Sequence, residues 1–385
     1  MSMIKKDAEY IIIQLWIMAM VMGIILRHVS EGLSNLLKWP LCAMGLMLML
    51  YLILYYNIMI EHKIMILLVL ISALINYLLI GMTTPYYLGY EFFVFIPIAL
   101  ALVYQKKFYL KLWVLEFMLV FLIVIGFWYK TSHFGYELFY STSRNYISIL
   151  LLFVLFFVSV ACEKKNREIP IVVSIAYFMA SLLGVGRGNV LAAGFYAMLY
   201  LIYIFFIKEF KTSKAKMIKK MIFFLGCIAA LIAVIVLFEY LQNTILSRFN
   251  SEAGDNSSSI RMEMLTDYLK SLMDLPKLLF GSNSRVLSFE LAAHDGNMHN
   301  SYFMLHAFFG SFTFMMMALG AFYSLIFSIS RKKYMLTIIL LCFLFRALTD
   351  FFFGGNIGDI LLWYFVLYPF GEIRKEKYLN EVAAV

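Results

Sequence analysis

Apolar runs of about 20 residues recur along the whole chain, and a helix of that length crosses the hydrocarbon core of a bilayer. The chain is 63% hydrophobic and only 14% charged, whereas ordinary globular chains are nearer half apolar and a quarter charged. It shows no series of alternating ten-residue segments of the kind found in membrane β-barrels. The sequence therefore predicts an all-α, polytopic membrane helical bundle that forms a single domain over residues 1–385.

We expect about twelve transmembrane helices, with spans near residues 10–26, 36–56, 64–80, 90–105, 112–128, 146–162, 169–185, 189–207, 221–241, 301–329, 334–352 and 357–371. Lys and Arg concentrate in every second connection, at residues 5–6, 63, 106–111, 164–167, 208–220, 331–333 and 374–377. By the positive-inside rule, these connections and both termini are cytoplasmic. The net charge of +9 is then expected to orient the chain rather than to bind nucleic acid.

One expected outer connection, residues 242–298, is far longer than the others. Loops of this length are usually functional. Within it, "SSSIRMEMLTDYLKSLM" places Ile260, Met264, Tyr268 and Leu272 four residues apart, which predicts an amphipathic helix. The serines at 257–259 suit its start, and Pro276 is expected to end it.

Arg187 stands between Gly186 and Gly188, where the seventh span is expected to turn into the eighth. Glycine lets the backbone approach a ligand closely, and the first N–H groups of a helix attract anions. Because a guanidinium matches phosphate oxygens, Arg187 is a candidate diphosphate-binding residue. The alternative is a tight turn with a snorkelling arginine.

Arg261 lies in the first turn of the expected loop helix, where a cation opposes the helix dipole. Either a carboxylate, such as that of Glu252, Asp255 or Glu263, offsets this charge, or an anionic ligand does. Arg261 is therefore a second candidate diphosphate-binding residue.

His299 and Asn300 stand where the long loop enters the next span. An imidazole can accept or donate a proton near neutral pH, and among apolar residues at a membrane surface it is costly unless it has partners. His299 is therefore a candidate catalytic residue, with a structural histidine as the alternative.

Four further residues are candidates for substrate binding: Asn300, Arg144, Arg346 and Asp350. Arg346 and Asp350 are four apart in one span and can pair on one helix face, so a structural ion pair is the alternative for these two. No outer cluster of Asp and Glu residues indicates a metal site. We therefore expect no metal and no cofactor.

Three stretches, in this order, resemble motifs of the O-antigen polymerase and O-antigen ligase superfamily of bacterial envelope glycosyltransferases. They are "GRGN" at 186–189, "SSIRMEMLTDYLKSLMDLPKLLFGSN" at 258–283 and "HNSYFMLHAFFGSF" at 299–312. The family has an arginine–glycine motif between two mid-chain spans. A large outer loop follows, with an arginine, a short helix and a PLxG segment, and an HNxYL motif closes it. The resemblance covers roughly residues 140–330.

This resemblance implies a reaction on the outer face of the bacterial inner membrane. Arg187 and Arg261 would bind the diphosphate of an undecaprenyl-diphosphate-linked glycan donor, and His299 would act on the acceptor hydroxyl. The acceptor would be a second lipid-linked unit, and a polysaccharide chain-length regulator would be a partner.

We interpret the chain as an oligosaccharide repeat-unit polymerase for O-antigen or another surface polysaccharide. An O-antigen ligase, which transfers the finished glycan to lipid A–core, uses the same donor and stays open. The alternative from another class is a flippase for the same lipid-linked sugar. The internal repeats typical of many transporters are not evident in the sequence, and a flippase does not need a long outer loop that bears His299.

Overall fold

The computed structural model describes residues 3–131, 137–139, 142–143, 146–183, 187–208, 217, 221, 257–293, 296–348, 350 and 356–383. The first described part of the chain contains the helices α1 (Met3–Leu26), α2 (Glu31–Tyr55), α3 (Ile60–Leu79), α4 (Pro85–Tyr90), η1 (Glu91–Phe95), α5 (Ile96–Tyr104) and α6 (Leu110–Thr131). A two-stranded antiparallel ribbon, β1 (Glu137–Phe139) and β2 (Thr142–Ser143), then precedes α7 (Tyr146–Lys164), α8 (Ile171–Leu183), α9 (Arg187–Ile202) and η2 (Tyr203–Ile207).

The second part begins in the long loop. It comprises α13 (Ser257–Ser271), α14 (Leu275–Phe280), η4 (Ser284–Val286), α15 (Phe289–Ala293), α16 (Ser301–Ser330), α17 (Tyr334–Ala347) and α18 (Asp359–Ala383). Apart from the short ribbon, every regular element among the described residues is helical.

Eight helices among the described residues are long and apolar enough to cross a membrane. They are Asp7–Leu26, Glu31–Tyr55, Ile60–Leu79, Pro85–Tyr104, Leu110–Phe127, Tyr146–Lys164, Gly188–Ile207 and Ser301–Ser330. Two shorter apolar helices are Ile171–Leu182 and Tyr334–Ala347. The expected span at 357–371 lies within α18, and the expected span at 221–241 lies outside the described residues except for Met221. The chain therefore has the make-up of a multi-pass helical membrane protein, while the count of twelve spans stays a prediction.

The centre of the bundle is formed by α7 and the first half of α18. In the apolar segment of α7, 89% of the residues are buried. Residues 359–369 of α18 are buried as well. A helix that is apolar all round, as α7 is, fits only where other helices surround it. α6, α8, α9 and α17 pack around α7, whereas α5 and α16 pack against α18. By contrast, α2 and α3 keep many apolar side chains exposed, as a surface in contact with lipid does.

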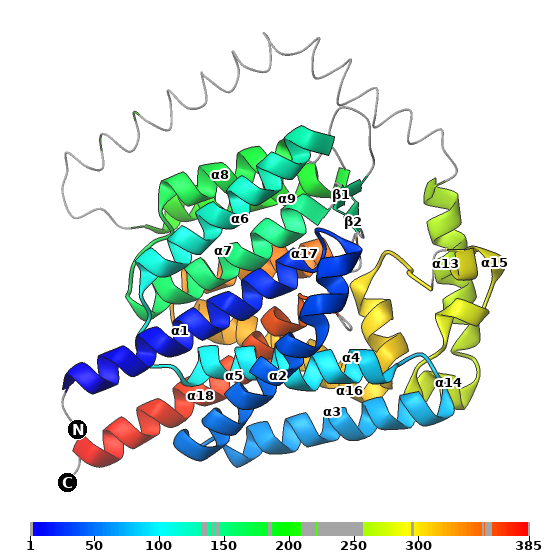
Figure 1. Ribbon diagram of the computed structural model, residues 1–385, viewed down its shortest axis with the longest axis horizontal. Coiled ribbons are helices and arrows are strands. Elements are labelled where there is room, and N and C mark those ends of the chain that lie inside the picture. Colours follow the sequence, from blue (N-terminus) through cyan, green and yellow to red (C-terminus); the bar gives the residue numbers. More distant parts are fainter. Residues whose placement is uncertain are drawn as a thin grey trace.

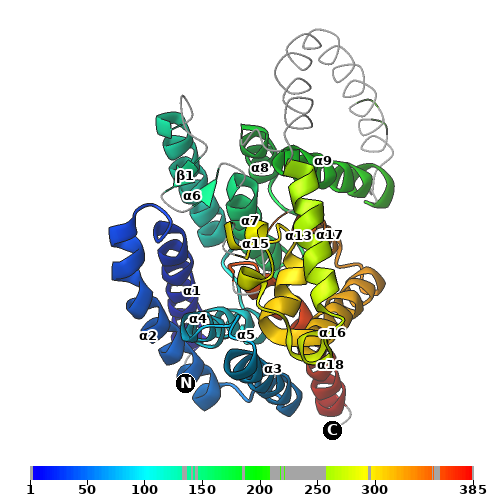
Figure 2. The same cartoon turned by 90° about the vertical axis from the view of Figure 1, so that its right-hand side faces the viewer.

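The described parts of the basic connections lie at one end of the bundle, where the two ends of the chain also lie (Figure 1). Four ion pairs join them: Lys107–Asp7 at 2.5 Å, Lys164–Glu372 at 3.1 Å, Lys208–Glu168 at 2.6 Å and Lys333–Glu163 at 2.7 Å. The loop helices α13 and α15 lie at the other end, which faces the viewer in Figure 2. The structure therefore separates the two sets of connections as the charge pattern predicts.

α16 is broken at Gly310, whose φ of 74° is outside the helical region. A break frees backbone carbonyls, and within a bilayer these need other partners. Side chains on or just after α3 supply the partners. Ser72 donates to the carbonyl of Phe309, Asn76 donates to that of Ala307 at 2.8 Å, and Thr83 donates to that of Phe308.

The long loop is attached to α16 through His306. The Nε2 atom of His306 lies 2.8 Å from the carbonyl oxygen of Leu278, and the Nδ1 atom lies 2.7 Å from the hydroxyl of Tyr268. Because a carbonyl only accepts, Nε2 carries the proton and Nδ1 accepts from the tyrosine. Burial raises the pKa of the Tyr268 phenol, which keeps it a donor. The loop helices α13 and α14 are thereby held against α16.

The amphipathic loop helix is confirmed as α13, which buries Met264 and Tyr268. Its predicted end at Pro276 is wrong, because α13 ends at Ser271 and Pro276 lies in the first turn of α14. Proline suits that position, since its fixed φ matches a helix and its missing N–H has no partner to lose there.

We predict that Gly310→Ala lowers the melting temperature of the purified protein. A Cβ at this residue would lie 2.5 Å from the carbonyl oxygen of Leu279. The φ of 74° and ψ of 177° also lie in a region almost confined to glycine, which costs another residue about 1–3 kcal/mol. Gly126→Ala in α6 is the matched control, because a Cβ there meets nothing within 4 Å. Equal melting temperatures for the two variants would show that the break does not need glycine.

Candidate functional site

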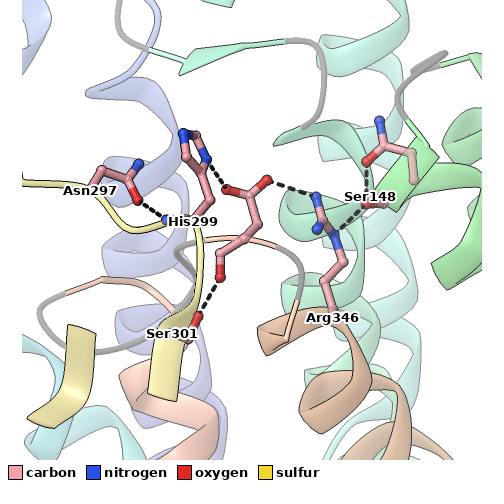
Figure 3. Close-up of polar contacts among 7 residues, drawn as sticks. Ser148, Asn297, His299, Ser301 and Arg346 are labelled. Carbon is pink, nitrogen blue, oxygen red and sulfur yellow. Dashed lines mark hydrogen bonds and ion pairs between the residues drawn. The ribbon is translucent and has the colours of Figure 1, made fainter. Parts of the chain in front are cut away.

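Arg346, near the end of α17, is the centre of a polar cluster (Figure 3). α17 begins beside the basic turn at residues 331–333, so the cluster lies at the opposite end of the bundle. Only 1% of Arg346 is exposed. Its Nη2 atom lies 3.1 Å from Oδ2 of Asp350, and its Nε atom donates to the hydroxyl of Ser148 at 3.3 Å. α17 ends at Ala347, so Asp350, four positions after Arg346, reaches the guanidinium from the chain beyond the helix and not from the same helix face. The ion pair that the sequence suggested is therefore present. Arg346 also contacts Ser148, which belongs to another helix.

The arginine–glycine motif contributes to the same cluster. A Cβ on Gly188 would lie 2.9 Å from Nη1 of Arg346, so the absence of a side chain there lets the guanidinium lie against the start of α9. One residue later, the buried Asn189 accepts a hydrogen bond from Ser148, which stands in the first turn of α7. The starts of α7 and α9 thus meet the end of α17 around one guanidinium.

His299 joins the cluster from the end of the long loop. Its Nδ1 atom lies 3.8 Å from Oδ1 of Asp350, and the two side chains are 25% and 18% exposed. The hydroxyl of Ser301 donates to the backbone carbonyl of Asp350 at 2.6 Å, which ties the two segments together. Asp350 therefore lies between a buried guanidinium and a partly exposed imidazole. Figure 3 shows the side chains of His299 and Arg346 on the two sides of this cluster.

The backbone at His299 is held in a conformation that few residues adopt. Its φ is 50°, in the left-handed region, where a residue with a Cβ is strained. The side chain of Asn297 accepts from the N–H of His299 at 2.8 Å. Asn300 caps α16 by accepting from the N–H groups of Tyr302 and Phe303. These two asparagines hold the backbone on either side of His299, and strained residues of this kind cluster at functional sites.

The structure brings together four of the residues selected from the sequence: His299, Asn300, Arg346 and Asp350. Asn300 belongs to the group through its hydrogen bond to the carbonyl of Leu348 at 3.4 Å and through its role as the helix cap. The side chain of Asn300 already bonds to backbone groups through its oxygen and its nitrogen. A substrate-binding role for Asn300 stays a prediction.

The other selected residues are not joined to this cluster by any contact that the structure describes. Arg187 begins α9 beside Gly188, and its side chain lies outside the described part of the chain, as does the whole of Arg144. Arg261 is exposed on the first turns of α13. Their roles in binding diphosphate or substrate stay predictions.

Ser148 is the member of the cluster that sequence reasoning missed. Gly188 and Asn189 belong to the selected "GRGN" stretch, but their places beside Arg346 and Ser148 were not predicted. Serine and asparagine in apolar helices are common, and only the packing of α7 against α9 and α17 reveals their partner. A second polar group was missed as well. The indole of Trp363 donates to the buried carboxyl of Glu91, and the nearby carboxyl of Asp359 accepts from the N–H of Asn356 at 2.8 Å.

Among the residues that the structure describes, no three His, Cys, Asp or Glu side chains are grouped so as to hold a metal ion. The expectation of a metal-independent reaction stays a prediction. No family model matches the chain, and no curated protein matches it. What the fold and the cluster define is a multi-pass helical protein with a histidine–aspartate–arginine site at one end of its bundle.

We predict that Asp350→Ala destabilises the protein, because it removes the carboxylate beside the buried guanidinium of Arg346. Breaking a buried pair costs about 3–5 kcal/mol, and the partial exposure of Asp350 places the loss at the lower end of that range. Melting temperatures in detergent give the measurement. Glu263→Ala on the exposed face of α13 is the control.

The double variant Arg346→Met/Asp350→Ala separates the ion pair from the loss of one side chain. It leaves no unmatched charge, so it should melt above the single Asp350→Ala variant. A double variant that melts lower than the single one would contradict this explanation.

Proposed function

We propose that the chain is a membrane glycosyltransferase that polymerises undecaprenyl-diphosphate-linked oligosaccharide repeat units on the outer face of the cytoplasmic membrane. The observation that supports it best is the contact between His299 and Asp350. A carboxylate beside Nδ1 favours the tautomer that carries its proton there, and this leaves Nε2 as the basic nitrogen. The imidazole is partly exposed, as a base that meets an incoming hydroxyl must be.

In the proposed reaction, an acceptor hydroxyl oxygen attacks the anomeric carbon of the donor glycan. The bond from that carbon to the diphosphate oxygen breaks, and undecaprenyl diphosphate leaves with the electron pair. The hydroxyl proton passes to His299, whose positive charge Asp350 then stabilises. A single displacement of this kind inverts the configuration at carbon. Arg187 and Arg261 are proposed to neutralise the departing diphosphate, which guanidinium groups do well in a site of low dielectric.

The location of the cluster also supports a lipid-linked substrate. An apolar pocket of about 180 Å³ lies between α16, α17 and α18, and its lining includes Tyr302 and Leu344. The hydroxyl of Tyr302 donates to the carbonyl of Leu344 at 2.9 Å, two residues from Arg346. A lipid carrier in contact with this surface would present its polar end to the His299 cluster.

Deletion of the gene in its own host, followed by complementation, tests the proposal. Wild type is expected to restore a ladder of surface glycan on a gel, whereas His299→Ala, Arg187→Ala and Arg261→Ala give only short glycan at normal protein level. A full ladder with His299→Ala would show that this histidine is structural. If the deletion strain accumulates long lipid-linked glycan instead of single units, the protein acts as a ligase.

A milder substitution tests whether the Arg346 cluster serves this activity. Gly188→Ala adds a methyl group 2.9 Å from the guanidinium and should shorten the ladder strongly, because it moves Arg346 without removing any charge. Gly194→Ala, six residues along the same helix, meets nothing within 4 Å and should leave the ladder unchanged. Identical ladders from the two variants would show that the activity does not depend on the position of Arg346.

A further inference from the structure

A pocket of about 250 Å³ lies at the end of the bundle opposite the His299 cluster. Three segments form it: the end of α7 with the turn that follows, the first residue of η2, and the turn between α16 and α17. Its charged lining consists of four cationic residues, Arg167, Arg331, Lys332 and Lys333, and two acidic residues, Glu163 and Glu168. The described residues around it belong to the same basic end that the charge pattern assigns to the cytoplasm.

Both carboxylates of the pocket already have lysine partners. Lys333 lies 2.7 Å from Glu163, and Lys208, just outside the lining, lies 2.6 Å from Glu168. The C-terminal ends of α7 and α16 carry a partial negative charge that offsets part of the remaining positive charge. With the acids already paired, the guanidinium and ammonium groups of the lining still leave the pocket positive.

The two turns that carry these cations have fixed conformations. Asn166 and Lys332 have φ values of 49° and 56°, the left-handed geometry that ends a helix. The N–H groups of Arg167 and Lys333 then bond back to the carbonyls of Cys162 and Ser328, each at 2.8 Å. The pocket is therefore formed by the fold itself and does not depend on a ligand to order it.

The surroundings of the pocket fit a lipid better than a free ion. Tyr203 and Tyr334 line it with their rings 5.6 Å apart, and such aromatic residues favour the membrane–water boundary. Phe206, three residues after Tyr203, and Ile329, two residues before Arg331, are 77% and 51% exposed, where acyl chains would contact the bundle. Basic pockets between helices on the cytoplasmic side suit anionic lipid head groups.

We propose that this pocket binds the phosphate of an anionic phospholipid from the inner leaflet. Arg331 and Lys332 would face the phosphate oxygens, and the exposed apolar side chains of η2 and α16 would contact the acyl chains. The pocket shares no residue with the His299 cluster, so lipid binding can be tested independently of the glycosyltransferase activity.

The test uses the purified full-length chain in detergent. Its melting temperature is followed as dioctanoyl phosphatidylglycerol, dioctanoyl phosphatidylcholine or inorganic phosphate is added. We expect phosphatidylglycerol to stabilise the wild type and the other two to have little effect. For Arg331→Ala/Lys332→Ala, the phosphatidylglycerol concentration that gives half of the maximal rise in melting temperature should increase on the order of tenfold.

The matched control is Lys63→Ala/Lys111→Ala, which removes the same charge from exposed residues outside the pocket. It should respond as the wild type does. If the pocket variant aggregates, Arg167→Gln replaces it. Three results would overturn the proposal: a pocket variant that responds like the control, an equal response to phosphatidylcholine, or a full response to phosphate alone, which would indicate an ion site.

Discussion

The burial of the Arg346 guanidinium governs the arrangement of the candidate site. A cation with 1% exposure in an apolar bundle is costly unless several groups around it are polar. The start of α7 and the chain after α17 provide those groups through Ser148 and Asp350, and Gly188 at the start of α9 leaves room for the guanidinium. Because these segments converge on one side chain, the arginine both fixes the end of the bundle and holds the carboxylate that faces His299.

The break in α16 has a related role. It separates a short helical segment, residues 301–309, from the longer part of the helix, and α3 and the residues after it satisfy the freed carbonyls. His299 stands two residues before this short segment and His306 lies near its end, where it holds the loop helices. Backbone that departs from helix geometry at membrane depth is tolerated only when protein groups pair with it. The break therefore gives the loop a rigid attachment beside the polar cluster.

Much of this architecture could be predicted from sequence, because long apolar runs and the spacing of charges are local signals. The loop helix around Tyr268, the pairing of Arg346 with Asp350, and the selection of His299 as a candidate residue all came from such patterns. The partners Ser148 and Asn189 could not be predicted, since their role depends on packing between helices far apart in the chain. The break at Gly310 was missed for the same reason, as its carbonyl partners come from α3. The twelve-span count and the roles of Arg187 and Arg261 still stand as predictions.

The most direct test of the account is a reaction with defined components. The purified protein, in lipid nanodiscs, would be incubated with the undecaprenyl-diphosphate-linked repeat unit extracted from the deletion strain, and the products would be weighed by mass spectrometry. The account predicts lipid-linked glycans of two and more units, with one undecaprenyl diphosphate released for each bond formed, and no products with His299→Ala. Folded wild-type protein that leaves the single unit unchanged would contradict it.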